Sequence, residues 1–351
     1  MATTQKDVAA RAGVSRGIVS KVMHGGGLTI RVNPQTAERV RQVASELGYQ
    51  PSALARNFRR QRTGQIGLMH GDGYSMFKFE SGSRYFASLM DGIVHGAFKH
   101  RYTLGLCPDL FGPSPESAMS DGRFDGFIWY RSFPSAKNEE RLKRCSAPIV
   151  FVHSRAAAWD DRFPTVICDN DQGIRLALEH LATLGHRRIA FAYEGAASFT
   201  ESVIRSDAFL SHGARMGLEV HTIDGHVDAF GNRAQYAGIR NYLAQNQRAT
   251  AIIAQNEQYA VDIMGLAKES GLGVPNDLSV VGFDSTAFCD HQTPPLTAIS
   301  QPLHLIGETA VDLLVQWIEG HIPDPLERLL PCGLDVRGST GPAPDSGFSQ
   351  P

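Results

Sequence analysis

The sequence predicts an N-terminal all-α helix-turn-helix head, followed by an α/β core of two doubly wound parallel-sheet subdomains. Three short amphipathic helical patterns within residues 1–50 indicate the head, and the first two are joined by a turn at a glycine. Short runs that are apolar on both strand faces, alternating with helical patterns, indicate the core. Roughly 280 residues of this alternation exceed what one open sheet usually holds, which favours two subdomains.

The first two helices have recognisable ends. Thr4 can cap the first helix, with Asp7 completing a capping box, and Gly13 can end that helix at positive φ. Ser15 can cap the second helix. The inward positions of the second helix are expected to be Ile18, Val19 and Val22. Its outward positions, which enter the DNA major groove in a helix-turn-helix, are expected to be Arg16, Gly17, Ser20 and Lys21. A plain structural helix pair is the alternative interpretation.

A third helix and a strong basic charge follow. Asn33 and Pro34 are expected to cap and begin that helix, and Gly48 to stop it. Residues 1–62 contain eleven Lys or Arg against three acidic residues, a net charge of +8. The whole chain carries −2, so the remainder carries −10. A basic head on an acidic body is typical of a protein that binds a polyanion.

Two runs in this region carry a family resemblance. KDVAARAGVSRGIVSKVM, followed by TAERVRQVASELGYQPSALAR, resembles the head and hinge of the lactose-repressor (LacI) family of bacterial transcription regulators. The phrases EHLATLGHRRIA and TPPLTAISQP extend the resemblance to about residue 340. The chain departs from the family pattern at Gln5, which is usually apolar, in the longer segment HGGGLTIRVNP, and at Phe58, where a minor-groove leucine is usual.

The resemblance implies a periplasmic-binding-protein-like core in which the chain crosses between subdomains three times, near Cys168, Ala298 and Glu327. The expected domains are the head at 1–50, a hinge helix or linker at 51–63 and the core at 64–340. Within the core, subdomain one would span 64–168 and 298–326, and subdomain two 169–297 and 327–340. A disordered tail is expected at 341–351, and because it has no leucine heptad, a homodimer is expected rather than a tetramer.

The hinge is expected to fold only on DNA, since about twelve highly charged residues make a marginal isolated helix. Two copies would pack together over the minor groove with Phe58 wedged into a base step, and a flexible tether is the alternative. The expected DNA-binding residues of head and hinge are Thr4, Ser15, Arg16, Gly17, Ser20, Lys21, Leu54, Ala55, Arg56 and Phe58.

Seven apolar runs are the expected core strands: 66–69, 103–107, 126–130, 148–152, 188–193, 251–254 and 278–283. A helix is expected to begin at an Asn170 cap and to end at Gly185, with His180 and His186 in structural roles beside its end.

Several functional classes are excluded or disfavoured by the sequence. It has none of the motifs GxxxxGK[ST], HExxH or GxSxG, so no enzymatic activity, cofactor or metal is expected. The five cysteines lack a CxxC pair and are expected to be reduced thiols. No apolar run approaches a membrane span and no secretion signal is recognised, so a cytoplasmic protein is expected.

Ligands of open α/β sheets bind beyond the carboxyl ends of the strands. Asn256 and Asp284 follow two such strands directly, although each could instead cap the next helix. The family resemblance implies ligand roles for Arg205, Phe230 and Gln301, with a surface ion pair as the alternative for Arg205. The expected effector-binding residues are Trp129, Tyr130, His153, Arg205, Phe230, Asn256, Asp284 and Gln301.

The sequence therefore predicts a dimeric, sequence-specific regulator of transcription. It is expected to be a repressor that binds double-stranded operator DNA and is controlled by a sugar-like effector. Two alternatives remain. One is the same regulator with a nucleobase or sugar-phosphate effector, and the other is a solute-binding protein, which the basic head disfavours.

Overall fold

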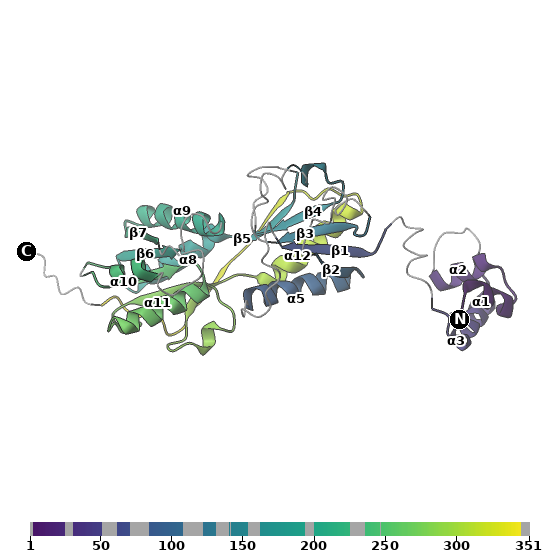
Figure 1. The fold of residues 1–351 in the computed structure, drawn as a ribbon, viewed down its shortest axis with the longest axis horizontal. Coiled ribbons are helices and arrows are strands. Elements are labelled where there is room, and N and C mark those ends of the chain that lie inside the picture. Colours follow the sequence, from purple (N-terminus) through teal and green to yellow (C-terminus); the bar gives the residue numbers. More distant parts are fainter. Residues whose placement is uncertain are drawn as a thin grey trace, which may run out of the picture. The chain divides into compact units, whose positions relative to one another are not determined.

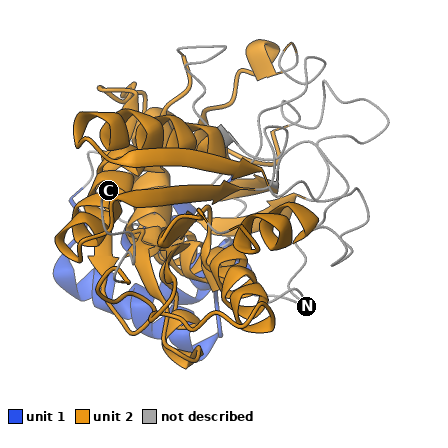
Figure 2. Cartoon of the chain, turned by 90° about the vertical axis from the view of Figure 1, so that its left-hand side faces the viewer, with its two compact units in different colours: residues 1–64 blue, residues 65–351 orange. Residues whose placement is uncertain are grey.

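The chain forms two compact units, residues 1–64 and 65–351, in a computed structural model (Figure 2). The structure describes residues 3–24, 31–50, 62–70, 84–107, 122–130, 140, 142–153, 162–193, 200–224, 236–245 and 247–344.

The first unit is a three-helix domain of α1 (Gln5–Ala12), α2 (Arg16–His24) and α3 (Pro34–Glu46). The predicted helix ends are confirmed. Thr4 and Asp7 form the capping box, and Gly13 ends α1 at a φ of 63°. Asn33 accepts a hydrogen bond from the backbone of Gln35 ahead of α3. The small core consists of Val8, Ala9, Ala12, Val19, Val40, Val43 and Ala44.

One predicted position of α2 is wrong. Ser20 was expected to face outward, but only 8% of its surface is exposed. It follows Val19, which is completely buried, so the buried stripe of α2 is wider than the apolar pattern indicates. Arg16 is exposed, whereas Gly17 and Lys21 are half-buried.

The second unit contains two six-stranded sheets (Figure 1). The first has the strand order β11-β5-β4-β3-β1-β2 and the second the order β12-β10-β9-β8-β6-β7. The strands of the first sheet are β1 (Gln65–His70), β2 (Thr103–Cys107), β3 (Gly126–Tyr130), β4 (Ile149–Val152), β5 (Thr165–Cys168) and β11 (Glu327–Leu330). Those of the second are β6 (Arg188–Tyr193), β7 (Glu219–Asp224), β8 (Ala251–Ala254), β9 (Ser279–Asp284), β10 (Thr297–Ser300) and β12 (Gly333–Asp335). All pairings are parallel except that of β12 with β10.

Each sheet and its helices form one lobe. The first lobe has α5 (Arg84–Lys99) and α12 (Leu303–Ile318), which pack closely against each other. The second lobe has α8 (Asn170–Thr183), α9 (Thr200–Arg215), α10 (Ala237–Leu243), α11 (Glu257–Glu269) and the short η4 (Cys289–His291). Figure 1 shows α9 and α11 on opposite sides of the second sheet. The predicted fold class, with two doubly wound lobes, is confirmed.

The expected boundaries at residues 298 and 327 differ from the observed topology by one strand each. β10 pairs with β9 and therefore belongs to the second lobe, while β11 pairs with β5 and belongs to the first. The second and third crossings consequently follow Ser300 and Leu330. Strand pairing between distant segments decides this assignment, and local pattern does not carry that information.

Two further predictions are wrong in detail. Asp169 rather than Asn170 caps α8, because its side chain accepts from the backbone of Gln172. Residues 341–344, expected to be disordered, are held against the second lobe. There, the backbone N–H of Gly341 donates to Ser279 Oγ and its carbonyl oxygen lies 3.1 Å from His186 Nε2, while the N–H of Ala343 donates to the carbonyl of Leu184. Residues 345–351 lie outside the described part of the chain.

The roles expected for the two histidines near the end of α8 are consistent with their surroundings. His186 is completely buried and contacts Thr250 and Ser279 at 2.8 and 3.0 Å, and burial lowers its pKa. Within the described ranges, no helix is long and apolar enough to cross a membrane. Nor do three or more His, Cys, Asp or Glu side chains of these ranges gather in a way that suits a metal ion.

Candidate functional site

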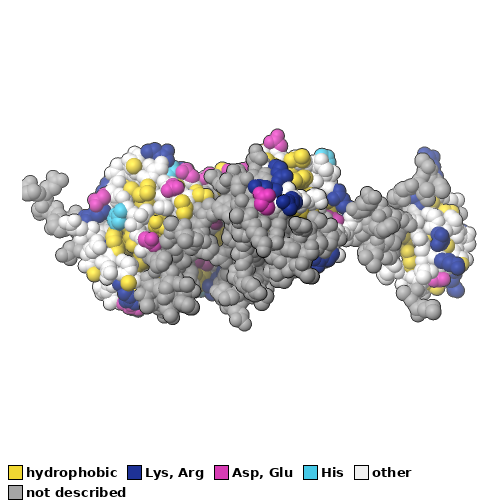
Figure 3. All heavy atoms as spheres, turned by 45° about the horizontal axis from the view of Figure 1, so that its top comes forward, with side chains coloured by type: hydrophobic (Ala, Val, Ile, Leu, Met, Phe, Trp, Pro, Cys, Tyr) yellow, Lys and Arg dark blue, Asp and Glu magenta, His cyan; other side chains and the backbone are white. Residues whose placement is uncertain are grey.

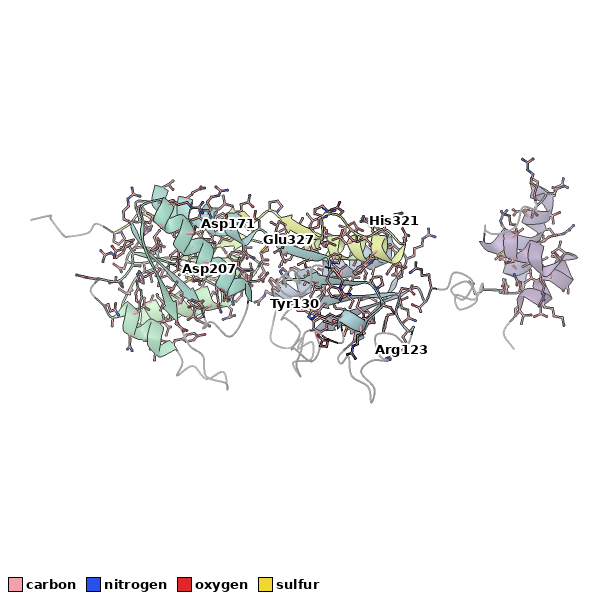
Figure 4. All side chains as sticks on the ribbon, turned by 90° about the horizontal axis from the view of Figure 1, so that it is seen from above. Arg123, Tyr130, Asp171, Asp207, His321 and Glu327 are labelled. Atoms are coloured by element: carbon pink, nitrogen blue, oxygen red, sulfur yellow. The ribbon has the colours of Figure 1, made fainter. Side chains whose placement is uncertain are left out.

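Polar side chains from both lobes meet beyond the carboxyl ends of the strands. His153 follows β4, Asn170 follows β5, Gln255 follows β8, Asp284 ends β9 and Gln301 follows β10. Glu201 and Arg205 join them from α9. This is the sheet edge at which open α/β proteins bind ligands. Figure 4 labels Tyr130, the last residue of β3, at the end of the first lobe that faces the second.

Arg205 is the centre of this cluster, with only 5% of its surface exposed. Its Nε donates to Oδ1 of Asn170 at 2.8 Å, and its Nη1 donates to the carbonyl oxygen of Gln255 at 2.6 Å. The guanidinium lies 3.5 Å from the ring centroid of Phe283, a cation–π arrangement. The alternative interpretation of Arg205 as a surface ion-pair residue is therefore wrong.

His153 and Glu201 join the two lobes. His153 Nδ1 lies 3.3 Å from Oε1 of Glu201, and Oε2 of the same carboxylate lies 3.8 Å from Nη2 of Arg205. Burial works to raise the pKa of Glu201, but His153 and Arg205 together hold it below its ordinary value. The Nε2 atom of His153 is buried without a hydrogen-bond partner among the described residues. Its ring also contacts those of Tyr85 and Tyr130 at 5.3 and 6.4 Å.

Asp284 and Gln301 form a second pair. Gln301 Nε2 donates to Oδ1 of Asp284 at 2.6 Å, and Gln301 Oε1 is buried with no partner in the described chain. Burial raises the pKa of Asp284 to about 6, with Glu257 adding to this and Arg205 opposing it. Asp284 has a φ of 97°, a conformation that a non-glycine residue rarely adopts and that often marks a functional site.

A buried carboxylate holds the loop that follows Asp284. Glu257 accepts from the backbone and hydroxyl of Thr286 at 2.8 and 2.7 Å, and from the thiol of Cys289 at 3.2 Å. The same loop carries Phe288, whose ring lies 4.4 Å from the guanidinium of Arg84 in the first lobe. Glu257 thus fixes the loop on which Asp284 and Phe288 stand.

Of the predicted effector residues, two have other roles in the structure and one lies outside the described residues. Trp129 is completely buried on the other face of the first sheet, against Phe151, because alternate residues of β3 point to opposite faces. Asn256 caps α11, since its Oδ1 accepts from the backbone of Tyr259 at 2.8 Å. Phe230 lies outside the described residues, as does Arg131 beside Tyr130.

Sequence reasoning missed four residues of the cluster: Tyr85, Asn170 as a partner of Arg205, Glu201 and Gln255. Only Glu201 has a local signal, because it lies four residues before Arg205 on the same helix, where an acid and a base can pair. The other three approach through contacts between distant segments.

The head has a separate candidate surface. Ser15 accepts from the backbone of Ile18 and so caps α2, as predicted. Thr4, Ser15 and Arg16 are exposed. Figure 3 shows several Lys and Arg side chains on the visible face of the first unit and few acidic ones. The hinge residues Leu54, Ala55, Arg56 and Phe58 lie outside the described residues, so their DNA contacts stay a prediction.

Comparison with known proteins gives consistent matches over both units. Residues 4–52 match the family described as bacterial regulatory proteins, lacI family, and residues 178–340 match a periplasmic binding protein-like domain. The HTH-type transcriptional repressor PurR of Edwardsiella ictaluri is 32% identical over 327 residues, which cover 90% of each chain.

Solved structures agree with these matches. The lac repressor dimer bound to operator and the anti-inducer ONPF is similar over 97% of this chain and 100% of that one, with a TM-score of 0.74 and 25% identity. The transcriptional regulator CelR in complex with cellobiose is similar over 96% of this chain and 99% of that one, with a TM-score of 0.67 and 26% identity.

Proposed function

Because the chain belongs to the LacI family of bacterial transcription regulators, we propose that it represses transcription from an operator under the control of a sugar-like effector. The effector would bind between the two lobes, among His153, Arg205, Asp284 and Gln301. The head would bind operator DNA through α2, with Arg16 at its exposed N-terminal end.

Two unpartnered buried polar atoms support the proposed effector site. His153 Nε2 and Gln301 Oε1 are buried polar atoms with no partner in the described chain, and they follow β4 of the first lobe and β10 of the second. Buried polar groups in native proteins nearly always have partners, so a pair left open at a sheet edge favours a ligand that supplies them. A sugar offers several hydroxyl groups, and the solved relative CelR is in complex with cellobiose.

The effector is tested by thermal unfolding with a panel of sugars. A ligand at about 100 times its dissociation constant adds about 2.7 kcal/mol to the free energy of unfolding. The variant Gln301→Ala should lose at least about tenfold in affinity for a sugar that stabilises the wild type, because it removes a hydrogen bond in a buried site. Gln258→Ala is the control, since Gln258 is exposed on α11 and its amide donates to Asp262. Equal affinity of both variants would contradict the assignment.

A homodimer is also proposed. Val94 and Phe98 lie one turn apart on α5 with 50% and 84% of their surfaces exposed, and Leu305 on the neighbouring α12 is 48% exposed. An apolar face of this kind favours an interface. A relative of this fold has been solved as a dimer on its operator. Phe98→Asp should therefore lower the dimer fraction in sedimentation velocity. Lys268→Asp at an exposed position of α11, which changes the charge by two units rather than one, serves as the control and should leave the dimer fraction unchanged.

The two alternative functions can each be distinguished by experiment. A nucleobase or sugar-phosphate effector would stabilise the protein where simple sugars do not. A solute-binding protein would bind its ligand and show no preference among DNA sequences.

A further inference from the structure

Two open atoms of the effector site, His153 Nε2 and Gln301 Oε1, accept hydrogen bonds, whereas the open Nδ2 of Asn170 donates. An ionised carboxylate only accepts, so the hydrogen bond between His153 and Glu201 requires the proton on His153 Nδ1. A neutral imidazole with its proton on Nδ1 presents a lone pair at Nε2, the atom left open. Gln301 likewise spends its amide N–H on Asp284 and leaves its carbonyl oxygen open. A ligand that satisfies these atoms must bring both donors and acceptors, as a hydroxyl group does.

Two of the five N–H donors of Arg205 make hydrogen bonds within the protein. Nε is bound to Asn170, Nη1 to a backbone carbonyl, and Nη2 lies nearest to Glu201, while one face of the guanidinium covers Phe283. These contacts fix the guanidinium, and an anionic ligand would have to compete for it with the Glu201 carboxylate, which lies 3.8 Å from Nη2. Arg205 therefore serves as a fixed part of the site.

Negative charges outnumber positive ones among the described residues of this region. Glu201, Asp284 and Glu257 are carboxylates that lie close enough to interact with one another or with Arg205. Arg84 adds a second cation, but it is exposed and lies over the ring of Phe288. Both Glu201 and Asp284 are ionised above neutral pH, since the pKa of Glu201 is below its ordinary value and that of Asp284 is about 6.

Building on the proposed effector site, we propose that it accepts an uncharged ligand rich in hydroxyl donors and rejects the phosphorylated or carboxylated forms of the same ligand. Acceptor atoms at His153, Asp284 and Gln301 bind the donors. The carboxylates of Glu201 and Asp284 repel an anion, and they do so strongly because the site is buried and poorly screened. The same discrimination applies whether the neutral ligand is a sugar or a nucleoside.

The experiment compares matched pairs at pH 7.5 by calorimetry with the full-length protein. Each pair consists of a neutral compound and its monophosphate, and the neutral compounds are glucose, galactose, ribose and adenosine. Cellobiose is added as a further neutral sugar, and glucuronate as the carboxylated form of glucose. The neutral member of a binding pair should bind at least about tenfold more tightly than the phosphate, which corresponds to about 1.4 kcal/mol. A phosphate that binds as tightly as its neutral parent would overturn the proposal.

Two variants locate the discrimination. Glu201→Gln and Asp284→Asn each remove one negative charge at nearly constant volume, and either should lower the ratio of neutral to phosphate affinity by about threefold or more. Glu269→Gln is the control, because Glu269 is an exposed residue of α11 paired with Arg240, and the ratio should stay at the wild-type value. An unchanged ratio in both site variants would overturn the role of these carboxylates.

The outcomes separate this proposal from the proposed function. If adenosine binds and the sugars do not, the sugar effector is wrong, while the preference for the neutral member still decides the inference. If a sugar binds less tightly than its phosphate, the inference is wrong and the regulator with a sugar-phosphate effector stands. If no member of any pair binds, both proposals are overturned.

Discussion

At the scale of single residues, Asp284 illustrates how a binding site lowers stability. Burial raises its pKa to about 6, so the folded state binds a proton that the unfolded chain has already released between about pH 4 and 6. Folding is therefore favoured by this group at low pH, and the advantage is lost as the pH rises through about 6. At neutral pH the ionised Asp284 destabilises the effector-free protein.

Asp284→Asn should relieve this effect. The amide still accepts from Gln301, but it carries no charge, so the free energy of unfolding at pH 7 should increase by roughly 1–3 kcal/mol. The gain should shrink as the pH falls towards 4. Urea unfolding between pH 4 and 8 measures it, with Asp207→Asn, an exposed residue of α9 labelled in Figure 4, as the control. A variant less stable than wild type at pH 7 would contradict the account.

Arg16 gives a prediction for the head. An exposed arginine at the start of α2 suits bidentate binding to the O6 and N7 atoms of a guanine. Arg16→Ala should then lose about 1–3 kcal/mol of operator binding and relax preference at one base pair in each half-site. Arg41→Ala, whose guanidinium pairs with Glu38 on α3, should leave base preference unchanged. Selection from a library of random duplexes compares the two, and a uniform loss over all sequences would mean that Arg16 contacts only phosphate.

The residues that sequence reasoning placed well have local causes. Thr4, Gly13 and Asn33 act on a helix end within four residues, so their neighbours in the sequence decide their roles. Ser20 and Trp129 were placed wrongly because the width of a buried stripe and the face of a strand depend on what packs against them. Gln255 was missed because its partner Arg205 is 50 residues away.

At the scale of elements, α5 and α12 are in such close contact that glycine is required. A Cβ built at Gly92 would collide with the carbonyl oxygen of His304, and one built at Gly307 with that of Leu89. These glycines lie inside helices, where glycine is otherwise unfavourable by about 1 kcal/mol relative to alanine. The close approach of the two backbones is therefore the reason for glycine at both positions.

Gly92→Ala should separate the two helices and lower the free energy of unfolding by about 1–3 kcal/mol, because overpacking outweighs the better helix propensity. Gly265→Ala on α11 is a matched control, since nothing lies within 4 Å of its added Cβ, and it should stabilise by up to about 1 kcal/mol. Opposite signs in urea unfolding are expected. Stabilisation by Gly92→Ala would show that the helices adjust freely.

Element type was predictable where the apolar run was long, as in β3 and β6, and less so where strands are short or half-exposed. Five strands, β5, β7, β10, β11 and β12, were not predicted. β5 and β10 are largely buried but only four residues long, β12 has three residues, and β7 and β11 have mixed burial. β10 and β11 were given to the wrong lobes, since the crossings near Ser300 and Leu330 are only two residues long and carry no sequence boundary.

At the scale of the whole molecule, the division into units at Gly64 separates the basic head from the acidic core. Removal of residues 1–62 should abolish operator binding and leave effector affinity within about twofold, because the effector residues all belong to the second unit. In the full chain, operator affinity should fall steeply with salt, since neutralised phosphates release counterions. Fluorescence anisotropy at several salt concentrations measures both effects. A shortened chain that still bound the operator would contradict the domain assignment.

An effector bound between the lobes should control DNA binding. The operator dissociation constant of the full chain, measured with and without a saturating effector found by thermal unfolding, reports this control. It should change by about 5- to 150-fold, the range of typical allosteric coupling, and by reciprocity effector affinity should change equally when operator is present. An operator dissociation constant that stays the same at every effector concentration would contradict it.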